Sequence, residues 1–251
     1  MALPAEHGAW GFLLEPIALG LLLAFSPSAI LLSLAMLAAF LVHQPLKITL
    51  KDLAKQRFTP RTAIAMRFAL LYGGTALICL VPVILVNGTA FLLPLLLASP
   101  LIFVQQRHDV RNQSRTLAAE MSGSLALGAT AAALVMLSDW AWAASLLLWG
   151  ILALRTITSI LYVRGKLRLE RDKPVQWRGI VAAHALALVL AAAWVVANVV
   201  PLSVLLGVLL LTMRAIHGLQ ARRNVKAARV GVGEMLIGLL YIVLVALGYA
   251  L

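Results

Sequence analysis

Three ionisable residues interrupt long apolar runs of this chain and are the first candidates for chemistry. Glu15 and Glu120 could exchange protons or orient cations, and Arg155 could hold an anion. Burying a charge in apolar surroundings is costly, so each of these residues needs a partner or a functional reason. Three further ionisable residues lie near the ends of apolar runs: Arg67, His184 and Glu234.

The composition shows what kind of element must carry these residues. The chain has 251 residues, of which 63% are hydrophobic and 12% are charged, and its mean hydropathy is +0.99. Soluble domains carry about twice that share of charge, roughly 25%. The sequence therefore predicts an all-α, polytopic transmembrane bundle. In such a protein the net charge of +12 indicates basic loops, and we expect no nucleic-acid partner.

Nine apolar segments are long enough, or nearly so, to cross a bilayer as helices. We expect them at about 10–25, 28–43, 63–86, 89–105, 117–137, 140–161, 179–198, 201–215 and 230–250. Basic loops are predicted at 43–61, 162–178 and from 215 to 229, with a shorter polar stretch at 105–116.

The distribution of charge predicts the orientation. All 21 Lys and Arg residues fall in or beside the loops after the second, fourth, sixth and eighth segments. Cytoplasmic loops are enriched in Lys and Arg, which places the N-terminus inside and the C-terminus outside. On this topology the ionisable residues gather in the inner half of the bilayer and indicate a cavity open to the cytoplasm.

Segments one to four and five to eight share a plan of short outer turns and a basic inner loop. We therefore predict one transmembrane domain over 1–251, built from a pseudo-repeat of 10–106 and 117–215 and a final helix at 230–250.

No phosphate-binding loop, aspartate-rich motif or zinc-protease motif is present. Glu6-His7 and His108-Asp109 are the only short pairs with metal-ligand residue types, and we predict no metal site.

The opening run Pro4-Ala5-Glu6-His7-Gly8-Ala9-Trp10-Gly11 resembles the start of the YwiC-like family of bacterial membrane proteins. The resemblance extends to Pro45-Leu46, to the segment from Arg115 to Glu120 and to Tyr162-Val163-Arg164. It implies a multi-pass protein of the bacterial cytoplasmic (inner) membrane and brings no established activity.

A weaker resemblance is to the UbiA family of intramembrane prenyltransferases, through the nine helices, the long inner loops and Glu15-Pro16-Ile17-Ala18-Leu19-Gly20. That family holds Mg²⁺ and a prenyl diphosphate through aspartate-rich motifs after helices two and six. Here those places read His43-Gln44-Pro45-Leu46-Lys47 and Tyr162-Val163-Arg164-Gly165-Lys166-Leu167-Arg168. Mg²⁺ prefers carboxylate oxygens, so the resemblance implies no magnesium site here and the cofactor stays open.

The leading hypothesis is a cytoplasm-facing site for an isoprenoid or phosphate-bearing lipid, with membrane lipids as partners and catalysis left open. Glu15 and Glu120 are the candidate catalytic residues. The candidate ligand-binding residues are His7, Trp10, Lys47, Arg115, Arg155, Tyr162 and Arg164, with His7 and Trp10 at the entrance. Lys166 and Arg168 are further cations that could neutralise a phosphate. The alternatives are a small-solute transporter and a non-enzymatic subunit or assembly factor of a membrane complex.

Overall fold

A computed structural model describes residues 7–220, 222 and 224–251, with side chains from Trp10 onward. Within these residues every element of regular secondary structure is a helix, which confirms the predicted fold class. The α-helices are α1 His7–Leu23, α2 Pro27–Ala54, α3 Pro60–Asn87, α4 Leu93–Val110, α5 Leu117–Val135, α6 Trp142–Glu170, α7 Trp177–Val196, α8 Leu202–Leu219 and α9 Ala227–Ala250. A short 3₁₀ turn, Ala90–Leu92, leads into α4.

The helix starts follow local capping rules. Ser26 accepts a hydrogen bond from the backbone N–H of Ala29 through its hydroxyl group, at 3.1 Å, and Pro27 follows as the first helical residue. Thr59 and Thr62 form a reciprocal capping box before α3, which also begins with a proline. These side chains satisfy backbone donors that the first turn of a helix leaves unpaired.

In the part of the chain that the structure describes, eight helices are long and apolar enough to cross a membrane, and α1 adds the shorter apolar helix Trp10–Leu23. Large apolar side chains are exposed along them: on α3, Leu70 is 69% exposed, Ile78 73% and Leu85 79%. Only 6% of the apolar window of α3 is buried within the protein. Such a surface is stable in lipid and not in water, so the chain is a multi-pass membrane protein.

Several helices are longer than the apolar segments predicted. The residues expected to form loops after His43 and after Tyr162 are helical: α2 continues to Ala54 and α6 to Glu170. Apolar length measures only the part of a helix that lies in hydrocarbon, and a helix can continue beyond it because its backbone bonds are internal. Pro45 removes one backbone donor without ending α2, and Thr49 donates its hydroxyl to the Pro45 carbonyl at 3.0 Å.

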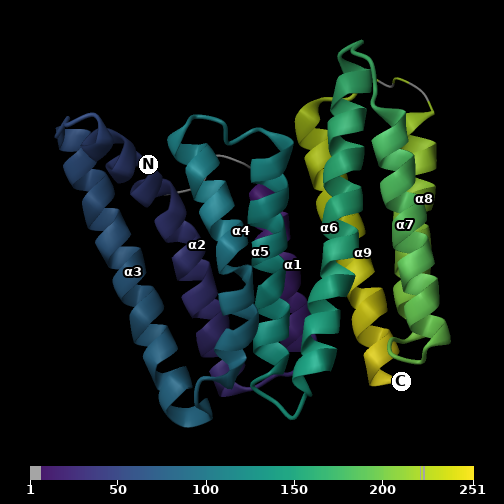
Figure 1. Ribbon diagram of the computed structural model, residues 1–251, viewed down its shortest axis with the longest axis horizontal. Coiled ribbons are helices and arrows are strands. Elements are labelled where there is room, and N and C mark those ends of the chain that lie inside the picture. Colours follow the sequence, from purple (N-terminus) through teal and green to yellow (C-terminus); the bar gives the residue numbers. More distant parts are fainter. Residues whose placement is uncertain (1–6, 221, 223) are drawn as a thin grey trace. The chain divides into compact units, whose positions relative to one another are not determined.

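The chain forms two compact units, residues 1–145 and 146–251. In unit 1, α1 packs against α5 and α2, while α2–α3 and α4–α5 form antiparallel pairs (Figure 1). Its core contains Leu32, Val83, Phe91 and Leu134. Gly20 permits the close approach of α1 to α5, because a Cβ atom there would lie 2.5 Å from the side chain of Leu134.

Unit 2 contains nearly all of α6 and the whole of α7, α8 and α9. The hydroxyl of Tyr241 on α9 donates to the carbonyl of Ile151 on α6, at 2.9 Å, and its ring packs on Gly207 of α8. Tyr162 of α6 packs on Gly218 of α8 in the same way. Glycine at these two positions lets aromatic rings lie directly against a helix backbone.

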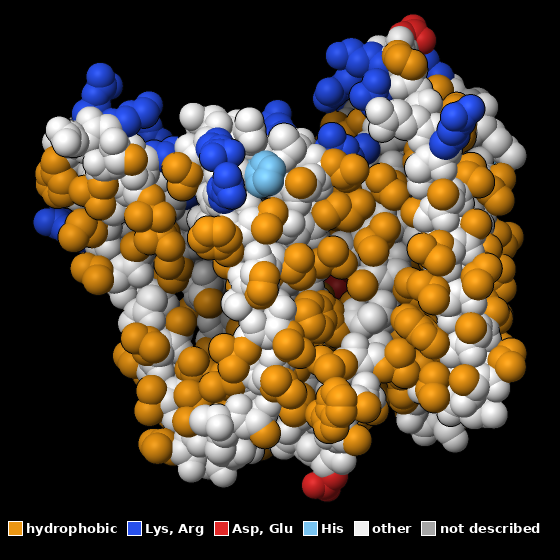
Figure 2. Space-filling model, in the orientation of Figure 1, with side chains coloured by type: hydrophobic (Ala, Val, Ile, Leu, Met, Phe, Trp, Pro, Cys, Tyr) orange, Lys and Arg blue, Asp and Glu red, His pale blue; other side chains and the backbone are white. Residues whose placement is uncertain are grey.

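Basic side chains gather at one end of each unit, as Figure 2 shows for the face in view. In unit 1 this is the end with the α2–α3 and α4–α5 loops, and in unit 2 it is the end with the α6–α7 loop. The orientation in the membrane and the pseudo-repeat both stay predictions.

Candidate functional site

A buried carboxylate organises the basic end of unit 1. Asp109, in the last turn of α4, is 2% exposed and binds two side chains of α2. His43 Nε2 lies 2.6 Å from its Oδ2, and Lys47 Nζ donates to its Oδ1 at 2.8 Å. Lys47 also donates to the hydroxyl of Ser114, in the α4–α5 loop, at 2.6 Å. Asp109 thus accepts a strong charge-assisted bond and fixes α2 against the end of α4.

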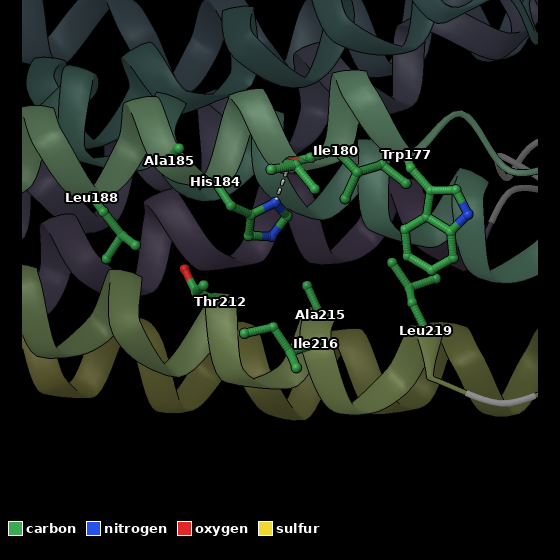
Figure 3. Close-up of a pocket in the computed structure, with 10 residues that line it drawn as sticks. Trp177, Ile180, His184, Ala185, Leu188, Thr212, Ala215, Ile216 and Leu219 are labelled. Carbon is green, nitrogen blue, oxygen red and sulfur yellow. Dashed lines mark hydrogen bonds between the residues drawn. The ribbon is translucent and has the colours of Figure 1, made fainter.

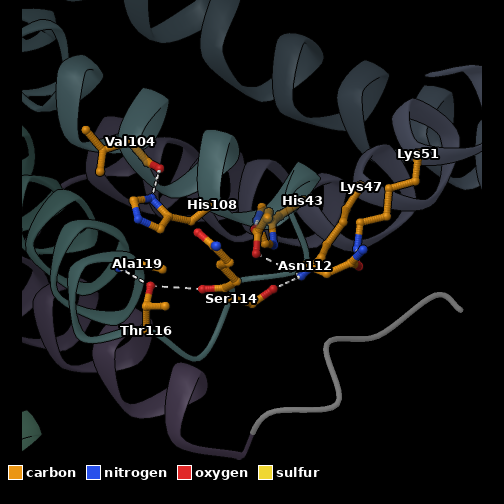
Figure 4. Close-up of polar contacts among 11 residues, drawn as sticks. His43, Lys47, Lys51, Val104, His108, Asn112, Ser114, Thr116 and Ala119 are labelled. Atoms are coloured by element: carbon orange, nitrogen blue, oxygen red, sulfur yellow. Dashed lines mark hydrogen bonds and ion pairs between the residues drawn. The ribbon is translucent and has the colours of Figure 1, made fainter.

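His43, Lys47 and Lys51 are spaced by four residues and lie on one face of α2, here termed the basic face. All three reach residues of the α4–α5 region: His43 and Lys47 bind Asp109, and Lys51 donates to the side-chain carbonyl of Asn112 (Figure 4). One carboxylate therefore binds both an imidazole and a cation, and Lys51 adds a further positive charge beside them.

A second charged cluster lies within unit 2. Arg214 of α8 pairs with Glu234 of α9 and points its NH2 group at the hydroxyl of Ser159, at 3.4 Å. The guanidinium carbon of Arg214 lies 4.0 Å from the ring centroid of Tyr162. Arg155, which is 2% exposed, donates to the backbone carbonyl of Glu234 at 3.1 Å. The cluster joins α6, α8 and α9 through groups that would be costly to bury singly.

Two further contacts tie the basic loops of unit 2 to α6. Lys166 pairs with Glu170 at 2.6 Å, and the other carboxylate oxygen of Glu170 accepts from the backbone N–H of Val225 at 3.0 Å. Arg168 donates to the carbonyl of Pro174 at 2.7 Å. Lys166 and Arg168, considered as phosphate-neutralising cations from the sequence, thus have structural partners within the chain.

The predicted site residues of unit 2 are divided between the cluster and its surroundings. Arg155 and Tyr162 both belong to the Arg214–Glu234 cluster. Arg164 is half-buried on α6, two residues beyond Tyr162. Their predicted role in ligand binding stays a prediction.

The predicted site residues of unit 1 lie on three helices and a loop. Glu15 is buried on α1 and Glu120 lies half-buried in the first turn of α5. Trp10 packs edge-to-face on Phe40 of α2, with ring centroids 5.4 Å apart. Arg115 is exposed in the α4–α5 loop. Lys47 is the member of this set that joins the Asp109 cluster; His7 has no described side chain, so its prediction lies outside the described residues.

Sequence reasoning missed the two residues around which the clusters form, Asp109 and Arg214. For Asp109 a signal was present, because the spacing of His43, Lys47 and Lys51 predicts a polar helix face that needs a partner. Among the residues with described side chains, no three His, Cys, Asp or Glu residues lie together as a metal site would require.

Comparison with known proteins identifies the family through unit 1. No curated protein and no solved structure matches the chain. Residues 3–135, more than half of the chain, match the family model described as YwiC-like protein. The matched region contains the basic face, Asp109 and Ser114, as well as Glu15 and Glu120. The resemblance to the UbiA family finds no support in these comparisons. The chain belongs to the YwiC-like protein family.

Proposed function

We propose that unit 1 binds the phosphate group of an amphipathic membrane lipid at its basic face. The observation that carries the proposal is the alignment of His43, Lys47 and Lys51 along α2 and their fixation against the α4–α5 region. A flexible lysine loses side-chain entropy when it binds a phosphate group, and this loss weakens the binding. Cations that are already held in position avoid part of that cost. Asp109 holds Lys47 in place before a ligand arrives.

The charge at this face favours an anion. Lys51 bonds to the neutral amide of Asn112, and no carboxylate among the described residues pairs with it. Arg111 and Arg115 are exposed in the adjoining loop and add positive charge at the same end. A cation near the surface of a membrane is worth about 1 kcal/mol in attraction to anionic lipid.

The surroundings of the basic face favour a ligand with an apolar chain. Leu50 and Leu53 of α2 are 40% and 53% exposed, and Phe58, in the loop that follows, is 68% exposed. Leu50 and Leu53 lie close to Lys51 in sequence, and with Phe58 they offer an apolar surface to a lipid whose phosphate meets the cations. An isoprenoid phosphate has this combination of groups.

Other predicted residues take supporting roles in this proposal. Glu120 starts α5 directly after the loop that carries Ser114, and with Glu15 it would orient cations or exchange protons if the lipid is processed. Trp10 would line the entrance. The unit lies, on this proposal, in a bacterial cytoplasmic membrane with its basic end facing the cytoplasm.

The test compares farnesyl phosphate with its dimethyl ester, which has the same chain and no negative charge. Binding to the purified protein in nanodiscs is measured by native mass spectrometry. We expect the charged lipid to bind more tightly and Lys51→Gln to weaken it about fivefold, the value of one interfacial charge.

The matched control is Arg61→Gln, which removes an exposed cation from the first turn of α3, away from the basic face. It should leave the affinity for farnesyl phosphate nearly unchanged. Equal affinity for the two lipids, or an equal loss in both variants, would contradict a site at the basic face.

A further inference from the structure

A groove between α7 and α8 of unit 2 has a cavity of about 230 Å³. Its lining is apolar apart from His184, Thr212 and the indole N–H of Trp177 (Figure 3). The residues that line it are Trp177, Ile180, Val181, His184, Ala185, Leu188, Thr212, Ala215, Ile216 and Leu219. None of them carries a fixed charge, so the groove favours a neutral molecule.

The imidazole of His184 points from α7 toward α8 and is 4% exposed (Figure 3). Its Nδ1 lies 2.8 Å from the carbonyl oxygen of Ile180. A carbonyl only accepts hydrogen bonds, so Nδ1 carries the proton and donates it. In the neutral imidazole Nε2 is then an acceptor, and it has no hydrogen-bond partner in the described structure.

No neighbouring side chain in the described structure pairs with this acceptor. The hydroxyl of Thr212 donates to the carbonyl of Val208 at 2.9 Å, and so its proton is used within α8. A buried water beside His184 needs two to four polar partners, and the lining offers it at most the lower number, His184 Nε2 and the hydroxyl oxygen of Thr212. A hydroxyl group attached to an apolar molecule needs a single acceptor, and Nε2 provides one.

The size and position of the groove fit a ring that enters from the bilayer. An engineered cavity of about 150 Å³ holds benzene, so the space here accommodates a substituted six-membered ring. Val181 and Ile216 at its edges are 61% and 59% exposed on helices long and apolar enough to span the membrane. A lipid-soluble molecule can therefore reach the groove laterally.

We propose that this groove binds the ring of a lipid-soluble phenol, with the phenolic hydroxyl donating a hydrogen bond to His184 Nε2. The apolar walls contact the ring, and an alkyl substituent extends along the exposed faces of α7 and α8 into lipid. The site is independent of the basic face of unit 1, because its ligand is neutral and its residues all belong to unit 2.

The test uses 4-decylphenol and 4-decylanisole, which share an apolar body and differ in the hydroxyl donor. Each probe is equilibrated between nanodiscs that contain the full-length protein and empty nanodiscs, and the excess bound to protein is measured. We expect the phenol to bind about tenfold more tightly than the anisole, as a bond to an otherwise unpaired buried acceptor implies.

Two variants separate the hydrogen bond from the cavity. His184→Phe keeps a ring and removes the acceptor, so the phenol should lose its advantage while the anisole still binds. Ala185→Trp fills the exposed edge of the groove and leaves His184 in place, so both probes should bind less. Thr212→Val is the control and should preserve the preference for the phenol.

Equal binding of the two probes to the wild-type protein would overturn the proposal. So would a phenol preference that persists in His184→Phe. Because neither probe is charged, these outcomes leave the binding of farnesyl phosphate by unit 1 untouched, and each proposal can fail without the other.

Discussion

Removal of the Asp109 carboxylate tests how strongly the basic end of unit 1 is held together. Asp109→Ala deletes the acceptor for His43 at 2.6 Å and for Lys47 at 2.8 Å. Hydrogen bonds to charged groups contribute about 1.5–3 kcal/mol each, so the gross loss is about 3–6 kcal/mol. The side chains of His43 and Lys47 are 24% and 17% exposed, so hydrogen bonds to water replace part of the lost energy. Lys47 also keeps its hydrogen bond to the hydroxyl of Ser114. We expect a net destabilisation of about 2–3 kcal/mol.

The assay is equilibrium unfolding by sodium dodecyl sulfate in mixed micelles, applied to Asp109→Ala, Lys47→Ala and the double variant. If the ion pair stabilises the fold, the double variant should lose at least about 1 kcal/mol less than the two single variants together. Additive losses, or a loss below about 0.5 kcal/mol in Asp109→Ala, would refute the inference that Asp109 fixes α2 against α4.

Three further predictions concern the packing and the orientation of the chain. Glu234→Gln leaves the guanidinium of Arg214 without its carboxylate and should lower the free energy of unfolding by about 3 kcal/mol in the same assay. Gly20→Ala should destabilise by about 1–3 kcal/mol because the new Cβ meets Leu134, whereas Gly74→Ala, with nothing within 4 Å, should be neutral or slightly stabilising. A cysteine at Ser138, in the α5–α6 turn, should react in intact cells with a membrane-impermeant maleimide.

Each of these predictions has a control. Arg222 pairs with Asp172, which is 81% exposed, so Arg222→Ala should cost no more than about 1 kcal/mol. If Arg222→Ala lowered the free energy of unfolding as much as Glu234→Gln, burial would not determine how much each ion pair stabilises the fold. For the labelling experiment, a cysteine at Lys173 in the α6–α7 loop should stay unlabelled until the cells are opened. Labelling at Lys173 in intact cells would reverse the orientation.

The sequence predicted the helical class and the number of apolar segments because hydropathy reports directly on lipid-facing length. It placed the C-terminal ends of α2 and α6 too early, since a pattern of polar residues after His43 or Tyr162 is the same for a loop and for a helix that emerges from lipid. The spacing of His43, Lys47 and Lys51, about one helical turn between neighbours, favoured a helix in that stretch.

The partners of the buried ionisable residues could not be predicted from the sequence. A deep arginine such as Arg155 was expected to need a partner, and the structure places the backbone carbonyl of Glu234 against it, 79 residues away. The partners of Asp109 lie 62 and 66 residues earlier in the chain. Local periodicity carries no information about such distant pairs, because they depend on which helices become neighbours.

The polar clusters also account for how these helices choose their neighbours. Apolar side chains gain little by leaving lipid for another helix, so burial of hydrophobic surface does not by itself select one helix pairing over another. In unit 1, Asp109 of α4 can satisfy His43 and Lys47 only if α2 lies alongside at the correct rotation. In unit 2, Glu234 of α9 imposes the same condition on Arg214 of α8. A slip of one residue would turn the partner away by about 100° and leave a charge buried alone. The clusters therefore set the register of the helices within each unit.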